Sequence, residues 1–250
     1  MAFLSLFLPL ASPFVGSFIT ASANCWPNWR QIFKTRSICS SCQQQLQNRD
    51  LIPVISYLLL RAKCRHCAEP IGWQHLFAEL VAILIALAAI VWFDGWMMLV
   101  TALFGWVLLF ASLVDYRLKL LPDGATLGLV IAGLLLQYLQ VGTAGLWLAL
   151  LGAIIGFAAF FAVSKLYRIL RGREGLGLGD AKLLAAGGAW CGPFALSWIV
   201  LLAASLALAG LMIRAAINRQ KLTADTALGF GPALATAIFV MWLLSSNGLG

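Results

Sequence analysis

The sequence between residues 76 and 115 reads LFAELVAILIALAAIVWFDGWMMLVTALFGWVLLFASLVD. It holds two apolar runs separated by Asp94 and Gly95, and each has the roughly 17 to 25 residues that a helix needs to cross a bilayer. Similar runs recur along the chain, with short polar breaks between them. We therefore expect an all-α polytopic membrane protein with about eight transmembrane helices, at residues 4–21, 76–93, 96–114, 125–141, 146–165, 181–190, 194–213 and 230–245.

The composition agrees with a chain whose solvent is lipid. Hydrophobic residues make up 62% of the sequence and charged residues 10%, and the mean hydropathy is +0.93, which excludes an ordinary soluble domain. The first run has no basic region before it and no small-residue cleavage site, so we expect a retained helix. The run at 181–190 is short and rich in Gly and Ala, as in a tilted, broken or closely packed helix.

The basic residues predict the orientation, because Lys and Arg concentrate on the cytoplasmic side of inner-membrane proteins. With eight helices and both termini outside, all 17 Lys and Arg residues fall on one side. The net charge of +8 is thereby explained by membrane orientation and anionic lipid, and it requires no nucleic-acid partner. These residues are Arg30, Lys34, Arg36, Arg49, Arg61, Lys63, Arg65, Arg117, Lys119, Lys165, Arg168, Arg171, Arg173, Lys182, Arg214, Arg219 and Lys221.

The polar segment between the first two helices carries two pairs of cysteines. CSSC supplies Cys39 and Cys42, and CRHC supplies Cys64 and Cys67. Four thiolates at ~2.3 Å from Zn²⁺ form a closed structural site, so the segment resembles a zinc ribbon. Two disulfides or four free thiols are the alternatives, and a reducing cytoplasm disfavours the disulfides. A loop with so few large apolar residues needs such a metal as its core.

Asp115 and Asp180 stand out among the nine acidic residues. The first follows an uninterrupted apolar run and the second begins the sixth predicted helix, so both fall on the same predicted membrane face. Two carboxyl groups held close together in a partly desolvated site share one proton. Such a pair hydrolyses peptides without a covalent intermediate, because one carboxylate activates water while the other carboxyl polarises the scissile carbonyl. For each aspartate alone, a helix cap or a salt bridge to Lys182 or Arg117 is the simpler role.

Several neighbouring residues are further candidates. Glycines in GLGLGD, at positions 175, 177 and 179, leave room for an extended substrate next to Asp180. Asp123 follows Pro122 where a helix begins, so we expect an N-cap. Glu79 lies one turn into the second helix, where it is a candidate for pairing with a basic loop residue or for binding a ligand.

The chain resembles the prepilin peptidases, the type 4 leader peptidases of the GxGD group of intramembrane aspartic proteases. The resemblance covers nearly the whole chain, because its motifs occur in the family's order. They are GSF at 16–18, the two cysteine pairs, DLIPVISYLLLRAKC at 50–64, the helix with Glu79, SLVDYRLKLLPD at 112–123, EGLGLGDAKLL at 174–184 and FGPAL at 230–234.

The resemblance implies a membrane endopeptidase that removes the basic leader from type IV prepilins or from type II secretion pseudopilins. Asp115 and Asp180 fall on the family's catalytic positions, and the four cysteines fall on its zinc-binding loop. Gly177, Gly179, Lys182 and Pro232 become candidate substrate contacts. Many members then methylate the new N-terminus with S-adenosylmethionine, so Glu79 is a candidate for the methyl-donor site or for a structural role.

The resemblance also predicts three parts, namely a first helix (1–23), a cytoplasmic zinc-binding loop with four cysteines (24–75) and a seven-helix peptidase domain (76–250), in the bacterial inner membrane. A proton-coupled transporter using Asp115 and Asp180 is a rival hypothesis, but it predicts repeated halves and acidic residues at the bilayer midplane. A thiol redox device built on the CxxC pairs is another, and it predicts activity that survives Asp-to-Asn substitutions.

Overall fold

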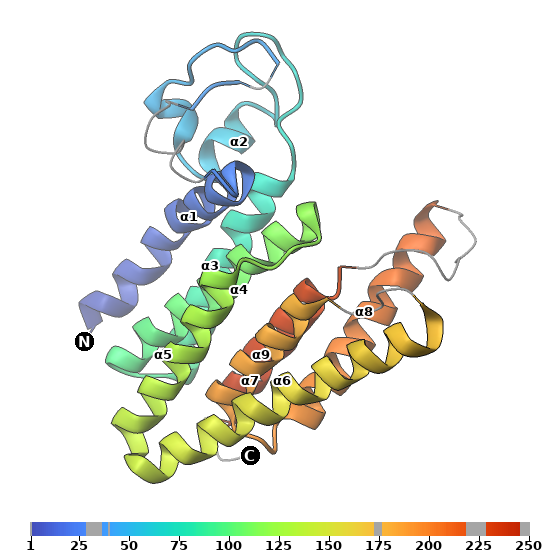
Figure 1. The fold of residues 1–250 in the computed structure, drawn as a ribbon. Helices are drawn as coiled ribbons and strands as arrows, with labels where there is room; N and C mark the ends of the chain where they lie inside the picture. Colours follow the sequence, from blue (N-terminus) through green and yellow to red (C-terminus); the bar gives the residue numbers. More distant parts are fainter. Residues whose placement is uncertain (1, 29–36, 40, 173–176, 219–228, 246–250) are drawn as a thin grey trace. The chain divides into compact units, whose positions relative to one another are not determined.

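The computed structural model describes residues 2–28, 37–39, 41–172, 177–218 and 229–245 of the 250-residue chain. This part of the chain is almost entirely helical, and its β-structure is limited to two isolated bridges, Ile38 with Gln45 and Lys63 with Pro70. Figure 1 shows the helices as long rods joined mostly by short turns. They are α1 (Ala2–Cys25), η2 (Asn48–Leu51), α2 (Ile55–Leu59), α3 (Gln74–Trp92), α4 (Trp96–Leu118), α5 (Asp123–Val141), α6 (Thr143–Arg171), α7 (Leu178–Cys191), α8 (Leu196–Asn218) and α9 (Gly231–Ser245).

The prediction of an all-α polytopic membrane protein is confirmed. Six of the described helices, α1, α3, α4, α5, α6 and α8, are long and apolar enough to cross a membrane. The two remaining predicted segments form the shorter helices α7, with 14 residues, and α9, with 15. Each predicted run therefore corresponds to a helix, and the largest difference in bounds is at α6, which continues to Arg171.

The described chain divides into two compact units, residues 1–110 and 111–250, and the boundary falls inside α4. In the first unit α1 packs along α3. A Cβ atom at Gly16 would lie 2.7 Å from the carbonyl oxygen of Ala78 and 2.7 Å from Cα of Glu79. Glycine is therefore needed at position 16, because the two helix backbones touch there.

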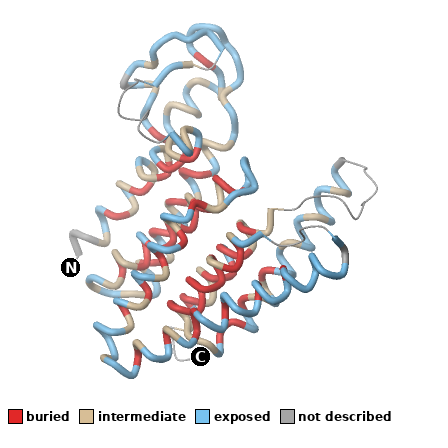
Figure 2. The backbone as a smooth tube through the Cα atoms, in the orientation of Figure 1, coloured by how far each residue is buried: buried red, intermediate tan, exposed pale blue. Residues whose placement is uncertain are grey.

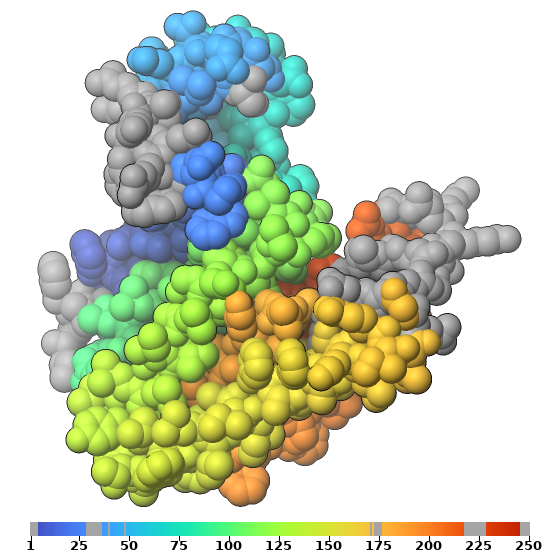
Figure 3. Space-filling model, viewed as in Figure 1, coloured from blue at the N-terminus to red at the C-terminus, as the bar shows by residue number. Residues whose placement is uncertain are grey.

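The second unit is built around α7. This helix packs against α5, α6, α8 and α9, and ten of its fourteen residues are buried. Figure 2 shows it as an almost continuous buried segment, and Figure 3 shows the side chains of α5 and α6 in front of it. A helix that is apolar on all sides is buried in a protein core or in a membrane, and of the three alternatives for this segment, tilted, broken or closely packed, the structure shows close packing.

Small residues make this packing possible. Gly188 of α7 and Gly152 of α6 meet backbone to backbone, so that a Cβ on either would overlap the other's carbonyl group. A Cβ at Gly156 would lie 2.7 Å from the carbonyl oxygen of Leu184. In lipid, helices associate by such close contact, since apolar burial itself supplies little driving force there.

Candidate active site

Asp115 lies in the last turns of α4, where its side chain is buried at 6% exposure. Two glycines before and at the start of α9 enclose its carboxyl group. A Cβ atom at Gly231 would lie 2.7 Å from Oδ2 of Asp115 and 2.8 Å from its Cγ, and one at Gly229 would lie 2.8 Å from the same Oδ2. The start of α9 can approach Asp115 only because these positions lack side chains.

Asp180 lies in the first turn of α7 at 9% exposure. Gly177 is the N-cap of this helix with extended backbone angles, and its carbonyl accepts the backbone N–H of Asp180 at 3.1 Å. The carboxyl groups of Asp115 and Asp180 lie close enough to interact electrostatically. The two buried carboxyl groups come from helices that are far apart in the sequence, and they are near enough to influence each other's charge.

Oδ2 of Asp115 is buried and has no hydrogen-bond partner among the described residues. A buried carboxylate oxygen without a partner is costly, and a bound water or substrate group would supply the missing hydrogen bond. A shared-proton pair that activates water also consists of two buried, interacting carboxyl groups, and the catalytic role of Asp115 and Asp180 stays a prediction.

Lys119 adds a positive charge beside this pair. Its Nζ atom and Oδ2 of Asp115 lie 2.7 and 2.8 Å, respectively, from the point where a Cβ on Gly229 would stand. Lys119 closes the end of α4 in a left-handed conformation with φ of 56°, and its backbone N–H donates to the Asp115 carbonyl at 2.9 Å. The ammonium group stabilises negative charge on Asp115 by direct attraction.

Gly177 and Gly179 occupy different environments at the start of α7. A Cβ atom at Gly177 would make an ordinary contact with Oδ2 of Asp180 at 3.5 Å, whereas one at Gly179 would lie 2.9 Å from Cβ of Leu121. Because Gly179 has no side chain, the LLPD segment, residues 120–123, can lie next to Asp180. Gly175 lies outside the described residues, and the role of these glycines in substrate binding stays a prediction.

Among the described residues, no ion pair joins Lys182 to Asp115 or Asp180. Its Nζ atom lies 2.6 Å from Oδ1 of Asp123, so the pair joins α7 to the first turn of α5. The predicted N-cap at Asp123 is wrong by one residue, because Pro122 is the N-cap and Asp123 is the first helical residue without a side-chain cap bond. Proline suits the helix start because it needs no N–H partner, which leaves the Asp123 carboxylate free to bind the lysine.

Pro232 is the second residue of α9, and its carbonyl accepts the hydroxyl of Thr236 at 2.8 Å. It lies directly after Gly231, so the FGPAL motif reaches the Asp115 carboxyl group through its glycine. Substrate binding by Pro232 and Lys182 stays a prediction.

Reasoning from the sequence missed Gly229, Gly231 and Lys119. Lys119 had a local signal, because residues four apart on a helix lie on one face and Asp115 and Lys119 have this spacing. Gly231 lies within the FGPAL motif, whereas for Gly229 the sequence signal was the GxG spacing around Phe230. Their contact with Asp115 joins α4 to α9, and helical periodicity within one element carries no information about such a pairing.

The four predicted cysteine ligands form a cluster in the first unit. Their Sγ atoms all lie within 4.8 Å of one another, and those of Cys39 and Cys67 are 3.9 Å apart. Tetrahedral Zn²⁺ with ~2.3 Å bonds needs sulfur atoms about 3.8 Å apart, so the donor set fits this ion. A disulfide requires about 2.05 Å between its sulfurs, and the cysteines are free in this structure.

Each cysteine pair begins a tight turn of the same construction. Cys39 N–H donates to the Gln44 carbonyl and Cys64 N–H donates to the Glu69 carbonyl, at 3.0 and 2.8 Å. The residue four positions after each of these cysteines, Gln43 or Ala68, has a positive φ near 58°. Backbone N–H groups of Cys42 and Ser41 lower the pKa of the Cys39 thiol to about 6. Thiolate is the form that binds metals.

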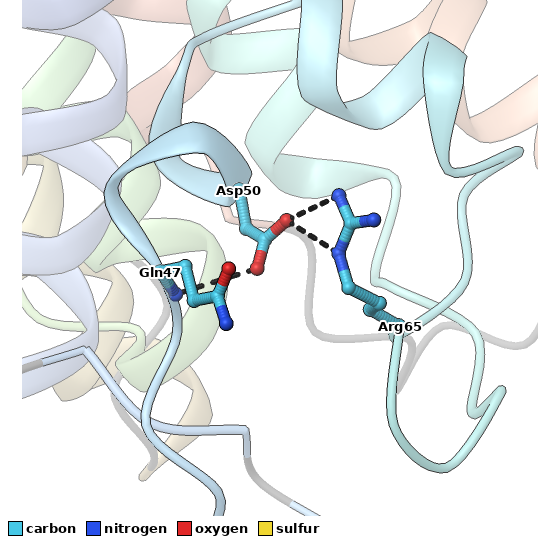
Figure 4. A network of polar contacts seen from close by, with 3 residues as sticks. All are labelled: Gln47, Asp50 and Arg65. Carbon is cyan, nitrogen blue, oxygen red and sulfur yellow. Dashed lines mark hydrogen bonds and ion pairs between the residues drawn. The ribbon is translucent and has the colours of Figure 1, made fainter.

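An ion pair joins the second turn to the segment before it. Arg65 donates to Oδ1 of Asp50 through Nε at 2.9 Å and Nη2 at 2.7 Å, and Oδ2 of Asp50 accepts the Gln47 N–H at 3.3 Å (Figure 4). The Asp50 side chain is only 3% exposed. Hydrogen bonding from Arg65 holds the pKa of Asp50 below its ordinary value.

Glu79 is buried at 6% exposure in the second turn of α3. Its Oε2 accepts the backbone N–H of Val54 at 2.7 Å, so its described partner is a backbone amide rather than a basic side chain. The Ser17 hydroxyl of the GSF motif also interacts with it. Glu79 therefore joins α1, α3 and the loop, and a role in binding a methyl donor stays a prediction.

Two family models match the chain. The bacterial peptidase A24 N-terminal domain matches residues 10–93, and the type IV leader peptidase family matches residues 102–213. No solved structure matches.

Curated relatives agree with these matches. The "Type 4 prepilin-like proteins leader peptide-processing enzyme" of Escherichia coli O78:H11 is 37% identical over 80% of this chain and 72% of the relative. A "Prepilin leader peptidase/N-methyltransferase" of Burkholderia pseudomallei is 40% identical over 80% of this chain and 64% of its own length. The "Prepilin leader peptidase/N-methyltransferase" of Aeromonas hydrophila is 38% identical over 83% of this chain and 71% of the relative. The chain belongs to the type IV leader peptidase family.

Proposed function

We propose that this chain is a membrane aspartic endopeptidase that removes the basic leader from type IV prepilins or type II secretion pseudopilins. The observation that carries the proposal is a pair of buried carboxyl groups, Asp115 of α4 and Asp180 of α7, that interact electrostatically. Relatives named as prepilin leader peptidases at 37 to 40% identity supply the substrate class.

The roles of the two carboxyl groups follow from their surroundings. Lys119 lies beside Asp115 and stabilises its negative charge, so Asp115 is the carboxylate that takes a proton from water. Asp180 then holds the shared proton and donates a hydrogen bond to the scissile carbonyl. As the tetrahedral intermediate collapses, Asp115 returns its proton to the leaving amine. The unpartnered Oδ2 of Asp115 is the acceptor for that water.

The site lies at the cytoplasmic face of the inner membrane in this proposal. Arg117 near the end of α4, Lys182 near the start of α7 and Arg214 near the end of α8 share that face in an alternating topology, as the positive-inside rule requires. Fourteen residues of α7 extend about 21 Å, less than the ~30 Å hydrocarbon core. Asp180 at its start is therefore recessed below the membrane surface, close to where a pilin's apolar helix begins.

Cleavage of a synthetic prepilin peptide by purified protein in detergent tests the proposal. We expect Asp115→Asn and Asp180→Asn each to lower the rate by about 100- to 10,000-fold, since each removes one proton-transfer group. Asp94→Asn is the matched control, because Asp94 is exposed in the turn between α3 and α4. Full cleavage by either site variant, with normal insertion and elution, would contradict the assignment.

We further propose that the enzyme methylates the new N-terminus with S-adenosylmethionine, as the names of several relatives suggest. Glu79 is the candidate residue of this chain for the methyl-donor site. The same assay with and without S-adenosylmethionine reads both reactions from the product masses. Glu79→Gln should then abolish the methylated product while cleavage continues. A cleaved but unmethylated product from the unmodified protein would leave the peptidase proposal standing and remove this one.

Zinc is the proposed metal of the cysteine cluster, where Cys39, Cys42, Cys64 and Cys67 would hold it in a closed structural site. The cluster supplies no open coordination position for a substrate, so the proposed proteolysis rests on the two aspartates. The division into a first helix (1–23), a loop with four metal-binding cysteines (24–75) and a peptidase domain (76–250) also stays a proposal.

A further inference from the structure

The short helix α2 presents its apolar side chains outward. Ile55, Leu58 and Leu59 are 55%, 64% and 78% exposed, and no residue of the helix is buried. Their spacing of three and four places all three on one helix face. Leu51 and Ile52 just before the helix are also exposed, at 41% and 40%. In water such a contiguous apolar surface marks an interaction site.

The depth of α2 relative to the membrane is set by a hydrogen bond within the first unit. Val54, the N-cap of α2, donates its backbone N–H to Oε2 of Glu79 at 2.7 Å. Glu79 is five residues inside the membrane-spanning helix α3, which begins at Gln74. At 1.5 Å per residue it lies about 7 to 8 Å below the start of that helix. The beginning of α2 therefore lies beside the second turn of a helix that is long and apolar enough to span a membrane.

The surroundings of Glu79 and of Val54 further hold the start of α2 at this level. Glu79 is packed against Gly16, which belongs to the middle of α1, so neither partner is at a frayed helix end. Pro53 next to Val54 is buried, and Val54 itself has a φ of 60°, unusual for a β-branched residue. A constrained backbone tied to a buried carboxylate keeps the start of α2 next to α3.

The charges around α2 match a lipid headgroup layer. Arg49, Arg61 and Lys63 flank the helix and are all exposed. The nearby carboxylate of Asp50 is already paired with Arg65. Interfacial helices bury their apolar face about 5 to 10 Å into the boundary between headgroups and acyl chains, and basic residues contact anionic headgroups.

We propose that α2 is an interfacial helix whose side chains Ile55, Leu58 and Leu59 insert into the lipid, with Arg49, Arg61 and Lys63 at the headgroups. Lipid is the occupant because the anchored end of α2 is level with a membrane-spanning turn. Figure 1 shows the cysteine loop beyond α2, away from the long helices of its unit. The metal-binding turns are thereby attached to the membrane surface at a defined depth. This inference rests on the membrane fold and not on the proposed peptidase activity.

Site-specific photocrosslinking tests the proposal. A benzophenone amino acid is introduced singly at Ile55, Leu58 or Leu59, and the full-length protein is placed in nanodiscs of phosphatidylethanolamine and phosphatidylglycerol. Ile38 is the matched control, because it is an apolar residue of the same loop at 48% exposure in the first cysteine turn. Irradiated protein is digested, and lipid adducts are quantified by mass spectrometry.

We expect lipid adducts at Leu58 and Leu59 at least fivefold more abundant than at Ile38. Each labelled protein should elute and bind metal like the unlabelled one, which shows that the exposed substitutions leave the fold intact. Adduct levels at positions 55, 58 and 59 equal to that at Ile38 would overturn the proposal. Crosslinks to a second copy of the chain, or to an added prepilin peptide, in place of lipid would overturn it as well.

Discussion

The cysteine loop and the helices around α7 are stabilised in opposite ways. In the loop, residues 37–72, nearly every described residue is exposed or half-exposed, and Cys64 and Pro53 are exceptions. In α7, ten of fourteen residues are buried. The loop is organised by four thiols, one ion pair and backbone turns, whereas α7 is organised by contacts between small residues.

This difference has a functional consequence. In a loop organised by four clustered thiols, the structure constrains mainly the cysteines and their turns. A helix packed backbone to backbone transmits the addition of one methyl group to its neighbours. Chemistry that depends on sub-ångström placement therefore belongs in the second region, where Asp115 and Asp180 lie.

Metal removal is the sharpest test of the loop. We expect about one zinc per purified chain by elemental mass spectrometry, because the four sulfurs already fit the ion. Cys64→Ser or a strong chelator should unfold the loop in an all-or-none manner, since the metal is its core. Trypsin cleavage at Arg49, Arg61 and Lys63 reports the unfolding.

Cys25→Ser and Cys191→Ser are the controls for this experiment, because both cysteines lie outside the cluster. They should retain the metal and resist trypsin in the loop. A metal-free protein whose loop resists trypsin equally well would show that the loop has another core.

Gly231→Ala is the corresponding test of the helices around α7. The added Cβ would stand 2.7 Å from Oδ2 of Asp115, so the start of α9 or the carboxyl group must move. We expect the cleavage rate to fall by about 100-fold, the order of loss that a misplacement of 1 Å produces in an active site. Peptide cleavage measures the effect.

Gly128→Ala in α5 is the matched control, because a Cβ there meets no atom within 4 Å. It should leave activity unchanged, as alanine also favours the helix. Equal activities of the two variants would mean that the close approach of Gly231 to Asp115 is not needed for catalysis.

Lys119→Met should lower kcat about tenfold, equivalent to about 1.4 kcal/mol in the barrier. In the proposed mechanism Asp115 takes the proton from water, and the Lys119 ammonium group stabilises its carboxylate. KM should change little, and Lys119→Arg should retain most of the activity because it keeps the charge. Lys165→Met, an exposed lysine of α6, is the control, and an identical small effect of both methionine variants would exclude a role for Lys119.

Asp50→Asn should have the smallest effect, a modest rise in loop hydrogen exchange at pH 7. The pKa of Asp50 is lowered by Arg65 from 3.8, so its contribution to stability is fully present above pH 3.8. That contribution disappears as the pH falls through the lower folded-state pKa. The exchange difference between the two proteins should therefore vanish in acid, and Glu69→Gln, at an exposed position of the same loop, should show none.

Much of this architecture could be predicted from local patterns. Apolar runs separated by short breaks predicted every long helix, because crossing a bilayer imposes a minimum length on each apolar segment. The two CxxC pairs predicted that the four cysteines cluster, because the spacing within each pair allows two thiols to bind one ion. Asp115 and Asp180 were identified because ionisable residues at the ends of apolar runs are rare and costly.

Other features required the assembled chain. The approach of Gly231 to Asp115 and of Leu121 to Gly179 joins segments that no periodicity connects. The sequence placed residues 55–59 inside the polar segment between the first two helices, and only the structure shows the bond from Val54 to Glu79 that ties the start of α2 to α3. The predicted N-cap at Asp123 was wrong because the helix begins at Asp123 with Pro122 as its N-cap, and the Asp123 carboxylate instead binds Lys182, 59 residues away.

By itself, then, the sequence determined the number and length of the apolar helices, the two cysteine pairs that cluster and the two candidate acidic residues. These properties depend on the transfer of each segment into lipid or on bonds between near neighbours in the chain. Only the tertiary structure decided which helix is central in the second unit, which glycines admit the Asp115 carboxyl group and which side chain ties the start of α2 to α3. Those properties depend on how closely separate backbones approach, and that distance is set by all the packed side chains together.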